Sequence, residues 1–155
     1  MEPLIYDAEP SDADAIADAW YAMMEQAGLL RERIPPRWRE GFIAHLLDGM
    51  QDGSQYWLVA RDHGSVVATG GAIVRRNEWS ITPPRAVIVG MYVRPSHRRR
   101  GIARAILTRL LQRCREQGFT EVRLQATAQG RPLYASVGFV PSDEMVLRYG
   151  AGIDA

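Results

Sequence analysis

An almost uninterrupted apolar run over residues 86–93 leads through an arginine-rich turn into a segment with helical periodicity. Such a run is typical of a strand that is covered on both faces of its sheet. After the turn, apolar residues recur at gaps of one and three, which places them on one face of a helix. These residues are Ile102, Ala103, Ile106, Leu107, Leu110, Leu111 and Cys114. The pattern predicts a buried strand, a tight turn and an amphipathic helix in direct succession.

The turn itself has the features of an anion-binding site. The first amides of a helix have no intrahelical partner, and the helix dipole makes that end electropositive. Gly101 allows a ligand to approach the backbone closely, and Arg98, Arg99 and Arg100 add positive charge. A P-loop is excluded because Ile102 follows Gly101 where Lys and then Ser or Thr would be required. We therefore expect the turn to bind a phosphate-like anion.

The turn also matches the pattern R-x-x-G-x-A through Arg98, Gly101 and Ala103, after a V-x-P formed by Val93 and Pro95. This resembles motif A of the GNAT superfamily of acyl-CoA-dependent N-acyltransferases, in which the turn amides hold the pyrophosphate of coenzyme A. Taken alone, the motif is also explained by a solvated basic helix start.

A second segment, residues 131–139, resembles the later L-Y-x-x-x-G-F signature of the same superfamily. The matching residues are Leu133, Tyr134, Gly138 and Phe139. Pro132 suits a first helical turn, Gly138 suits its end, and Phe139 would open a further strand. The two motifs occur in the expected order and spacing, and the resemblance extends from the N-terminal strand to about Leu147.

The remaining patterns predict strands over residues 4–8, 56–61, 65–75, 120–126 and 145–149. One helix is expected to run from an N-cap at Ser11 to Gln26, and another from Pro35 to about Gly53. With the resemblance, this implies a mixed α/β (α+β) GNAT-type fold. Its twisted, mostly antiparallel central sheet would have helices on both faces and a splayed central strand pair. The 155 residues are expected to form a single domain, residues 1–155.

The resemblance implies acetyl-CoA as the cosubstrate. In the superfamily the pantetheine arm enters between the splayed strands and pairs with free backbone groups, here those of Met91 and Val93. Gly90 either marks a bulge at this point or is merely tolerated for packing. The coenzyme-binding residues that the resemblance implies are Met91, Tyr92, Val93, Arg98, Arg99, Arg100, Gly101, Ile102, Ala103 and Arg104.

Transfer of an acyl group to an amine needs an unprotonated amine, an N–H donor for the oxyanion and a proton for the thiolate. The oxyanion donor would be a backbone amide near Tyr92 or Val93. Tyr134 stands where the superfamily places a tyrosine beside the coenzyme A sulfur, and a phenol of pKa about 10 is protonated at neutral pH. The alternative role of Tyr134 is that of an aromatic side chain that caps the core.

The general base and the acceptor are left open. A glutamate that the superfamily often has on its central strand is absent from residues 88–91, so Glu25, Glu78 and water are the candidates. An asparagine frequently found before the second motif is replaced around Thr127, which weakens side-chain contacts to pantetheine there. The segments on the expected acceptor side contain Trp20, Tyr21, Met24, Trp38, Phe42 and Trp79. If a few of them face the cleft, the acceptor has an apolar or aromatic portion.

Composition excludes several classes of protein. The net charge of +1 and the lack of aromatics among the arginines argue against nucleic-acid binding. The three histidines are scattered, so no metal site is expected. No long apolar run or signal peptide appears, which predicts a soluble cytoplasmic protein without membrane contact.

The sequence therefore favours an acetyl-CoA-dependent N-acetyltransferase that acts on a primary amine, expected to be a small molecule, by direct attack in a ternary complex. The alternative is a non-catalytic sensor that binds acyl-CoA. The presence of Tyr134 favours the enzyme, whereas the missing strand glutamate keeps the sensor open. A homodimer also remains open.

Overall fold

The computed structural model of the protein describes residues 3–31, 34–76 and 83–149. The chain divides into two compact units, Met1–Gln125 and Ala126–Ala155. Glu78 and Trp79 lie outside the described residues.

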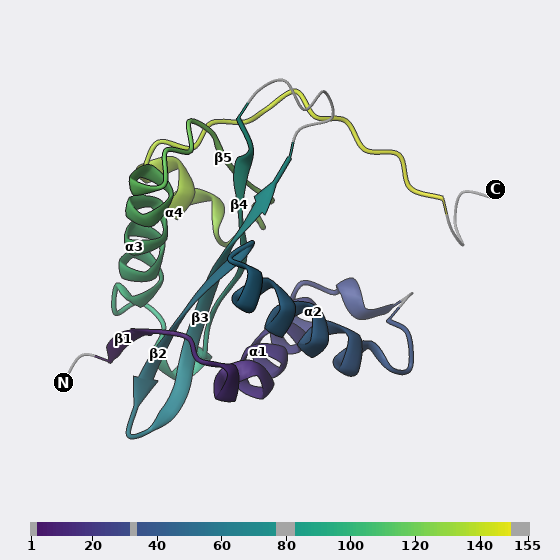
Figure 1. The fold of residues 1–155 in the computed structure, drawn as a ribbon, viewed down its shortest axis with the longest axis vertical. Coiled ribbons are helices and arrows are strands. Elements are labelled where there is room, and N and C mark those ends of the chain that lie inside the picture. Colours follow the sequence, from purple (N-terminus) through teal and green to yellow (C-terminus); the bar gives the residue numbers. More distant parts are fainter. Residues whose placement is uncertain (1–2, 32–33, 77–82, 150–155) are drawn as a thin grey trace. The chain divides into compact units, whose positions relative to one another are not determined.

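Within its described residues, the first unit is built on a five-stranded sheet in the order β1-β2-β3-β4-β5 (Figure 1). The strands are β1 (Leu4–Asp7), β2 (Gln55–Asp62), β3 (Ser65–Arg75), β4 (Arg85–Val93) and β5 (Val122–Leu124). Neighbouring strands are antiparallel except for β4 and β5, which are parallel. A parallel pair needs a crossover, and the helix between β4 and β5 supplies it.

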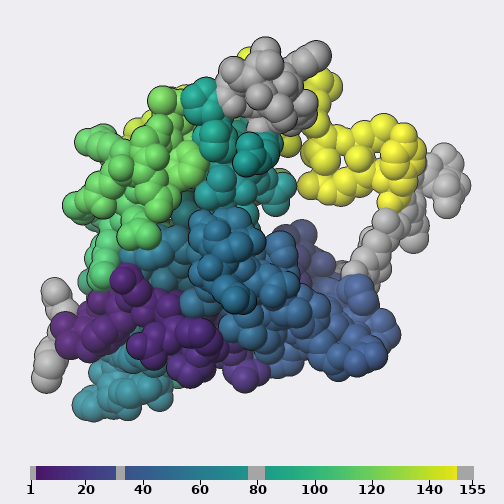
Figure 2. Space-filling view, in the orientation of Figure 1, coloured from purple at the N-terminus to yellow at the C-terminus, as the bar shows by residue number. Residues whose placement is uncertain are grey.

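Helices cover both faces of this sheet. The helices are α1 (Ala13–Gln26), α2 (Trp38–Asp52) and α3 (Ile102–Glu116), and α3 lies on the other side of the strands from α1 and α2 (Figure 1). One core joins Ile16 of α1, Leu46 of α2 and Trp57 of β2. On the opposite face, the buried side of α3 is formed by Ile102, Ile106, Leu107, Leu110 and Cys114. In the space-filling view, the purple and blue atoms of α1 and α2 form one continuous surface (Figure 2).

The β2–β3 hairpin closes through a two-residue turn of His63 and Gly64. Both residues have positive φ, +48° and +80°, which is the geometry of a type I′ turn. Asp62 and Ser65 are paired on either side of it. This turn therefore fixes the position of Asp62 at the end of β2.

The second unit contains the short helix α4 (Arg131–Ser136). The carbonyl of Thr127 accepts hydrogen bonds from the amides of Gly130 and Arg131 at its start, and Gly138, with φ of +106°, ends the turn that follows it. Residues 139–149 have no regular secondary structure, and Met145 is 94% exposed.

The predicted fold class is confirmed, including the mostly antiparallel sheet and the helices on both faces. The strand predicted over residues 145–149 is wrong, and so is the prediction that Phe139 opens a strand. An alternating apolar pattern becomes a strand only when a neighbouring strand accepts and donates its backbone hydrogen bonds, and residues 139–149 form no ladder with any described residue. The strand predicted over residues 120–126 is present but shorter, Val122–Leu124.

Ser11 is not the N-cap of α1. A 3₁₀ turn, η1 (Pro10–Asp12), precedes the helix, and Asp12 occupies the N-cap position of α1 without a side-chain capping hydrogen bond. The buried carboxylate of Asp12 accepts a hydrogen bond from the amide of Glu9 at 2.8 Å and bonds from Arg61 at 2.7 and 2.9 Å. Because these contacts satisfy Asp12 inside the fold, the helix begins two residues after Ser11.

Candidate functional site

The central strands separate at the end of β4 where the sequence predicts a cofactor. β5 pairs with β4 only from Ala86 to Ile88, whereas β4 continues to Val93. On its other side β4 stays paired with β3, where Val93 lies opposite Ala68. The predicted backbone groups of Met91 and Val93 thus lie on the part of β4 that has left β5. An extended ligand can pair with a strand edge of this kind.

Gly90 forms a bulge in β4. The register of β3 against β4 shifts between Thr69 and Gly71, and Gly90 has φ of +63°. A left-handed glycine at a two-against-one position is the geometry of a G1-type bulge. The bulge alternative for Gly90 is therefore confirmed, and the strand changes its hydrogen-bonding phase just before Met91.

Two residues that the sequence analysis did not single out support this bulge. The Thr69 hydroxyl donates a 2.8 Å hydrogen bond to the carbonyl of Gly90, and Thr69 is 1% exposed. The ring of Trp57 covers Gly90 so closely that an added Cβ would lie 2.5 Å from it. A threonine inside the apolar β3 was the sequence signal for the first contact, whereas nothing local indicated the second.

The turn between β4 and α3 contains two residues in the left-handed conformation. Arg99 has φ of +60° and Gly101, the N-cap of α3, has φ of +76°. No side chain of the described residues caps the helix, and its first intrahelical bond is the one from the Ala105 amide to the Gly101 carbonyl. The amides of Ile102 and Ala103 are therefore available to an anion, as predicted for a phosphate site.

The arginines of the turn have different surroundings. Arg98 donates hydrogen bonds to the carbonyl of Val93 at 2.9 Å and to Gln26 at 2.6 Å, and its guanidinium lies 5.8 Å from the centre of the Tyr92 ring. Arg100 donates to the carbonyl of Ser96 at 3.2 Å. Arg99 is exposed and has no hydrogen-bond partner among the described residues.

The arginines of the turn therefore differ in their structural roles. Arg98 joins the turn to β4 and to the end of α1, and Gln26 was not foreseen in this role. Arg99 and Arg100 carry the charge that lies nearest to the open helix end in sequence. Arg104, in the first turn of α3, is exposed.

Tyr134 lies in the second unit, on α4. Its ring packs against Phe139 with centroids 6.0 Å apart, and its amide donates to the carbonyl of Gly130 at 3.2 Å. Burial raises the pKa of the Tyr134 hydroxyl above its ordinary value of 10.0. The phenol is therefore a proton donor, not an anion, over the neutral range.

The predicted acceptor-side aromatics cluster between α1 and α2. Trp20 lies 5.0 Å from Trp38 and 5.3 Å from Phe42, measured between ring centroids, and Tyr21 stacks on Trp38 at 5.5 Å. The rings pack against one another, so most of their surface is used to hold α1 against α2. Tyr21 is the most open of them, at 40% exposed.

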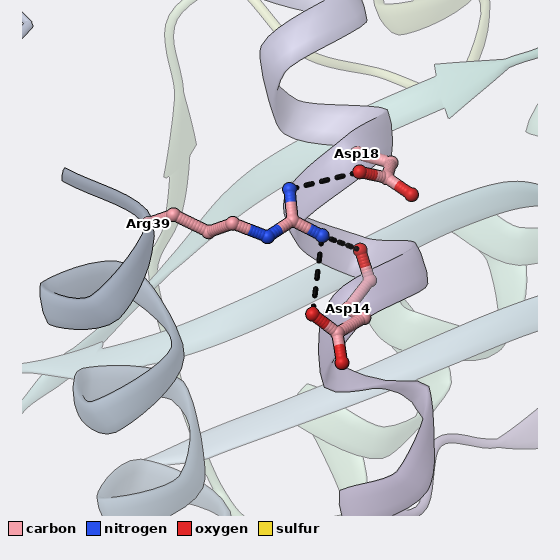
Figure 3. Close-up of polar contacts among 3 residues, drawn as sticks. All are labelled: Asp14, Asp18 and Arg39. Carbon is pink, nitrogen blue, oxygen red and sulfur yellow. Dashed lines mark hydrogen bonds and ion pairs between the residues drawn. The ribbon is translucent and has the colours of Figure 1, made fainter. Parts of the chain in front are cut away.

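Arg39 of α2 fastens the same two helices. It donates to the carboxylates of Asp18 at 2.8 Å and Asp14 at 3.1 Å, both on α1, and to the Asp14 carbonyl at 3.2 Å (Figure 3). The hydrogen bond to Asp18, followed by that to Asp14, raises the pKa of the arginine above its ordinary value. The ion pairs hold α1 in place over the ends of β3 and β4.

A pocket of about 310 Å³ lies beneath α1 at these strand ends. It is open because α1 presents small side chains there, among them Ala15, Ala19 and Ala22. The polar side chains at its wall are those of Asp18, Ser65, Tyr92 and Arg94. Tyr92 thus belongs both to the predicted coenzyme-binding residues and to the wall of this pocket.

The described residues provide little else that points to a particular chemistry. Glu25, in the last turn of α1, is exposed. Among the described residues no group of three or more histidine, cysteine or acidic side chains could hold a metal ion. No helix in the described part of the chain combines the length and apolar character needed to cross a membrane.

A sequence model of the Acetyltransferase (GNAT) family matches residues 18–139. The chain therefore belongs to the GNAT acetyltransferase family, and the resemblance seen in its two motifs is confirmed.

Individual relatives agree with this assignment. Human N-acetyltransferase 8 is 37% identical over 90 residues, which are 56% of this chain and 39% of that protein. The chain thus spans well under half the length of that curated relative. A GCN5-related N-acetyltransferase from Ralstonia eutropha superposes with a TM-score of 0.80 at 29% identity, over 94% of this chain and 97% of the other.

A predicted acetyltransferase from Clostridium acetobutylicum, crystallised with acetyl-CoA, superposes with a TM-score of 0.82 over 94% of this chain and 95% of its own. At 20% identity this likeness concerns the fold alone.

Proposed function

We propose that the protein is an acetyl-CoA-dependent N-acetyltransferase, with residues 1–155 as one GNAT domain in the cytoplasm. The observation that carries this proposal is the β4–α3 turn. Arg99 and Gly101 adopt left-handed conformations there, and the first amides of α3 have no side-chain cap. Next to it, β4 leaves β5 after Ile88. Together these features support one binding site for the pyrophosphate and the pantetheine of coenzyme A.

In the proposed reaction the amine nitrogen attacks the thioester carbonyl in a ternary complex, and the carbon–sulfur bond breaks. A backbone amide near Tyr92 or Val93 stabilises the oxyanion. Tyr134 gives its proton to the departing thiolate, a role supported by its protonated state over the neutral range. The proton of the attacking amine leaves through water, Glu25 or Glu78.

The acceptor in this proposal is a small molecule with a primary amine. The pocket beneath α1 supports a small acceptor because its volume is at the lower end of the range for small-molecule sites. The wall of the pocket carries both Asp18 and Arg94, and Asp18 also pairs with Arg39, so its charges do not select a cationic acceptor.

The alternative function is an acyl-CoA sensor without turnover. Two observations favour it: β4 carries no acidic residue between Arg85 and Val93, and Glu25 is exposed at the end of α1. The sensor and the enzyme share the coenzyme site, so only turnover separates them.

Binding is tested first, by thermal unfolding with and without acetyl-CoA. A ligand at about 100 times its Kd stabilises the folded state by about 2.7 kcal/mol, so we expect a clear rise in melting temperature. Gly101→Glu should abolish the rise, because it places bulk and negative charge at the helix end. The matched control is Gly118→Glu at the other end of α3. Gly118 also has positive φ, +83°, and open space around it, so it carries the same backbone strain.

Turnover is then measured as release of free coenzyme A across a panel of small amines. No rise in melting temperature with millimolar acetyl-CoA would contradict both functions. A rise without turnover on any amine would leave the sensor. An equal loss of binding in Gly101→Glu and Gly118→Glu would indicate that the phosphate binds elsewhere than at the turn.

A further inference from the structure

A hydrogen-bonded pair joins the β2–β3 hairpin to the turn between β4 and α3. His97 Nε2 lies 2.7 Å from an oxygen of Asp62, and His97 Nδ1 lies 2.7 Å from the hydroxyl of Ser96. The histidine side chain is 15% exposed and the aspartate 31% exposed. Both ring nitrogens are therefore engaged, and the imidazole is held in one orientation.

Each partner is placed by a rigid local structure. Asp62 ends β2 immediately before the type I′ turn of His63 and Gly64. His97 belongs to the 3₁₀ turn η3 (Pro95–His97), and its amide donates to the carbonyl of Arg94 at 2.9 Å. The pair thus connects two short structures that lie far apart in the sequence.

The turn that His97 anchors is strained at Arg99. A non-glycine residue with φ near +60° is strained and persists only where its surroundings hold it. The residues on either side are held: Arg98 by the carbonyl of Val93, and Arg100 by the carbonyl of Ser96. His97, two residues before Arg99, is held by Asp62 across the two turns.

Asp62 also carries a negative charge, which would repel an anionic ligand at the turn. Its second oxygen lies 3.5 Å from Nε2 of His63, and the hydrogen bond to His97, with smaller contributions from His63, His97 and Arg100, lowers the pKa of the carboxyl group. Asp62 is therefore an anion beside a site built for phosphate. Its charge opposes the ligand, whereas its hydrogen bond holds the turn that binds it.

We propose that Asp62 and His97 are positioning residues of the phosphate-binding turn. Their hydrogen bond holds the turn in the conformation that presents the first amides of α3, and so sets the affinity for coenzyme A. The inference rests on the proposed function only in that the ligand carries the pyrophosphate. Neither residue takes part in the transfer itself.

The test uses isothermal titration calorimetry with coenzyme A, because three substitutions separate the two effects of Asp62. Asp62→Ala removes the hydrogen bond, and we expect the Kd to rise about tenfold, as for one hydrogen bond to a charged group. Asp62→Asn keeps an acceptor oxygen and removes the charge, so the Kd should stay equal or fall by up to about threefold at low salt. His63→Ala changes the exposed neighbour and should leave the Kd within about twofold.

A second arm tests whether the two residues act as a unit. His97→Ala should weaken binding as much as Asp62→Ala, and the double variant should be no weaker than either single variant. With acetyl-CoA and an acceptor, these variants should raise KM for acetyl-CoA and leave kcat unchanged. Far-ultraviolet circular dichroism of each ligand-free variant confirms that it is folded.

The outcomes distinguish this inference from the proposed function. If the unaltered protein does not bind coenzyme A, the proposed function fails. If it binds and Asp62→Ala binds equally well, the positioning role fails. If Asp62→Asn weakens binding as much as Asp62→Ala, the charge and not the hydrogen bond is what the site requires, which also overturns the inference.

Discussion

Tyr134 combines a half-buried ring with a hydroxyl that has no hydrogen-bond partner within residues 126–149. Replacing it by phenylalanine keeps the packing on Phe139 and removes the proton donor. Loss of a positioned general acid costs about 10²–10⁴-fold in rate, and we expect a fall in kcat within or somewhat below this range because water can substitute in part. The Kd for acetyl-CoA should change only a few-fold.

The pH dependence provides a second readout. A tyrosine acid works only while protonated, and burial raises its pKa. The fall of kcat at alkaline pH should therefore begin above the ordinary tyrosine pKa of about 10, and this limb should be missing in Tyr134→Phe. Tyr149→Phe, an exposed tyrosine of the same unit, is the control. Full single-turnover activity in Tyr134→Phe would remove the residue from the mechanism.

Gly90 is constrained twice, by its left-handed backbone and by the ring of Trp57. Gly90→Ala should lower the free energy of unfolding by about 2–4 kcal/mol, because it adds backbone strain and overpacks a buried ring. Gly41→Ala is the matched control: it lies within α2, where an added Cβ meets nothing within 4 Å. We expect this control to gain about 0.5–1 kcal/mol.

Urea unfolding followed by circular dichroism measures both glycine variants. Equal stabilities for the two would mean that the contact between Trp57 and Gly90 imposes no constraint. Gly90 also shows what the sequence alone could not decide. A glycine in a strand indicated either a bulge or tolerance, and the deciding contact comes from β2, far away along the chain.

At the scale of elements, α1 and α2 are joined by aromatic packing and by the ion pairs of Arg39 with Asp14 and Asp18. The side chain of Arg39 is 38% exposed, so solvent screens these pairs. Arg39→Ala should lower the free energy of unfolding by about 0.5–1 kcal/mol at low ionic strength, and by less in about 1 M salt.

Arg37→Ala provides the comparison for Arg39. Among the described residues Arg37 forms an ion pair with Glu40 alone, and both side chains are mostly exposed, so its removal should change stability very little. Chemical unfolding at two salt concentrations distinguishes the variants. An effect of Arg39→Ala that is the same at both concentrations would attribute the loss to packing on Trp38 and not to charge.

Helices and strands with a clear hydrophobic periodicity were predicted correctly from the sequence. β4, α3 and the β2–β3 hairpin were predictable because each carries its pattern within its own residues. The start of α1 was not predictable, because it depends on the contact between Asp12 and Arg61, and Arg61 lies on β2. The strand expected at residues 145–149 failed for a related reason: its alternation is local, but its backbone partners would have to come from elsewhere.

At the scale of the whole molecule, the family match over residues 18–139 includes both sequence motifs. The fold class followed from them because two motifs in the right order restrict the topology strongly. The sequence also indicated the turn that we propose as the phosphate site, because glycine and arginine at a helix start have few structural uses. The contacts around this turn and around the β4 bulge were not predictable, because Gln26 and Asp62 reach the turn from α1 and β2, and Thr69 reaches Gly90 from β3.

The burial of Cys114 within α3 determines whether a protein thiol interferes with a colorimetric assay for free coenzyme A. Its side chain is 3% exposed and burial raises the pKa of its thiol, so both access and thiolate formation are unfavourable. The protein contains one cysteine in all. A chromogenic disulfide reagent added to capture newly freed coenzyme A therefore meets almost no competing protein thiol while the chain is folded. A slow additional signal of one equivalent per chain would measure how often α3 leaves the sheet.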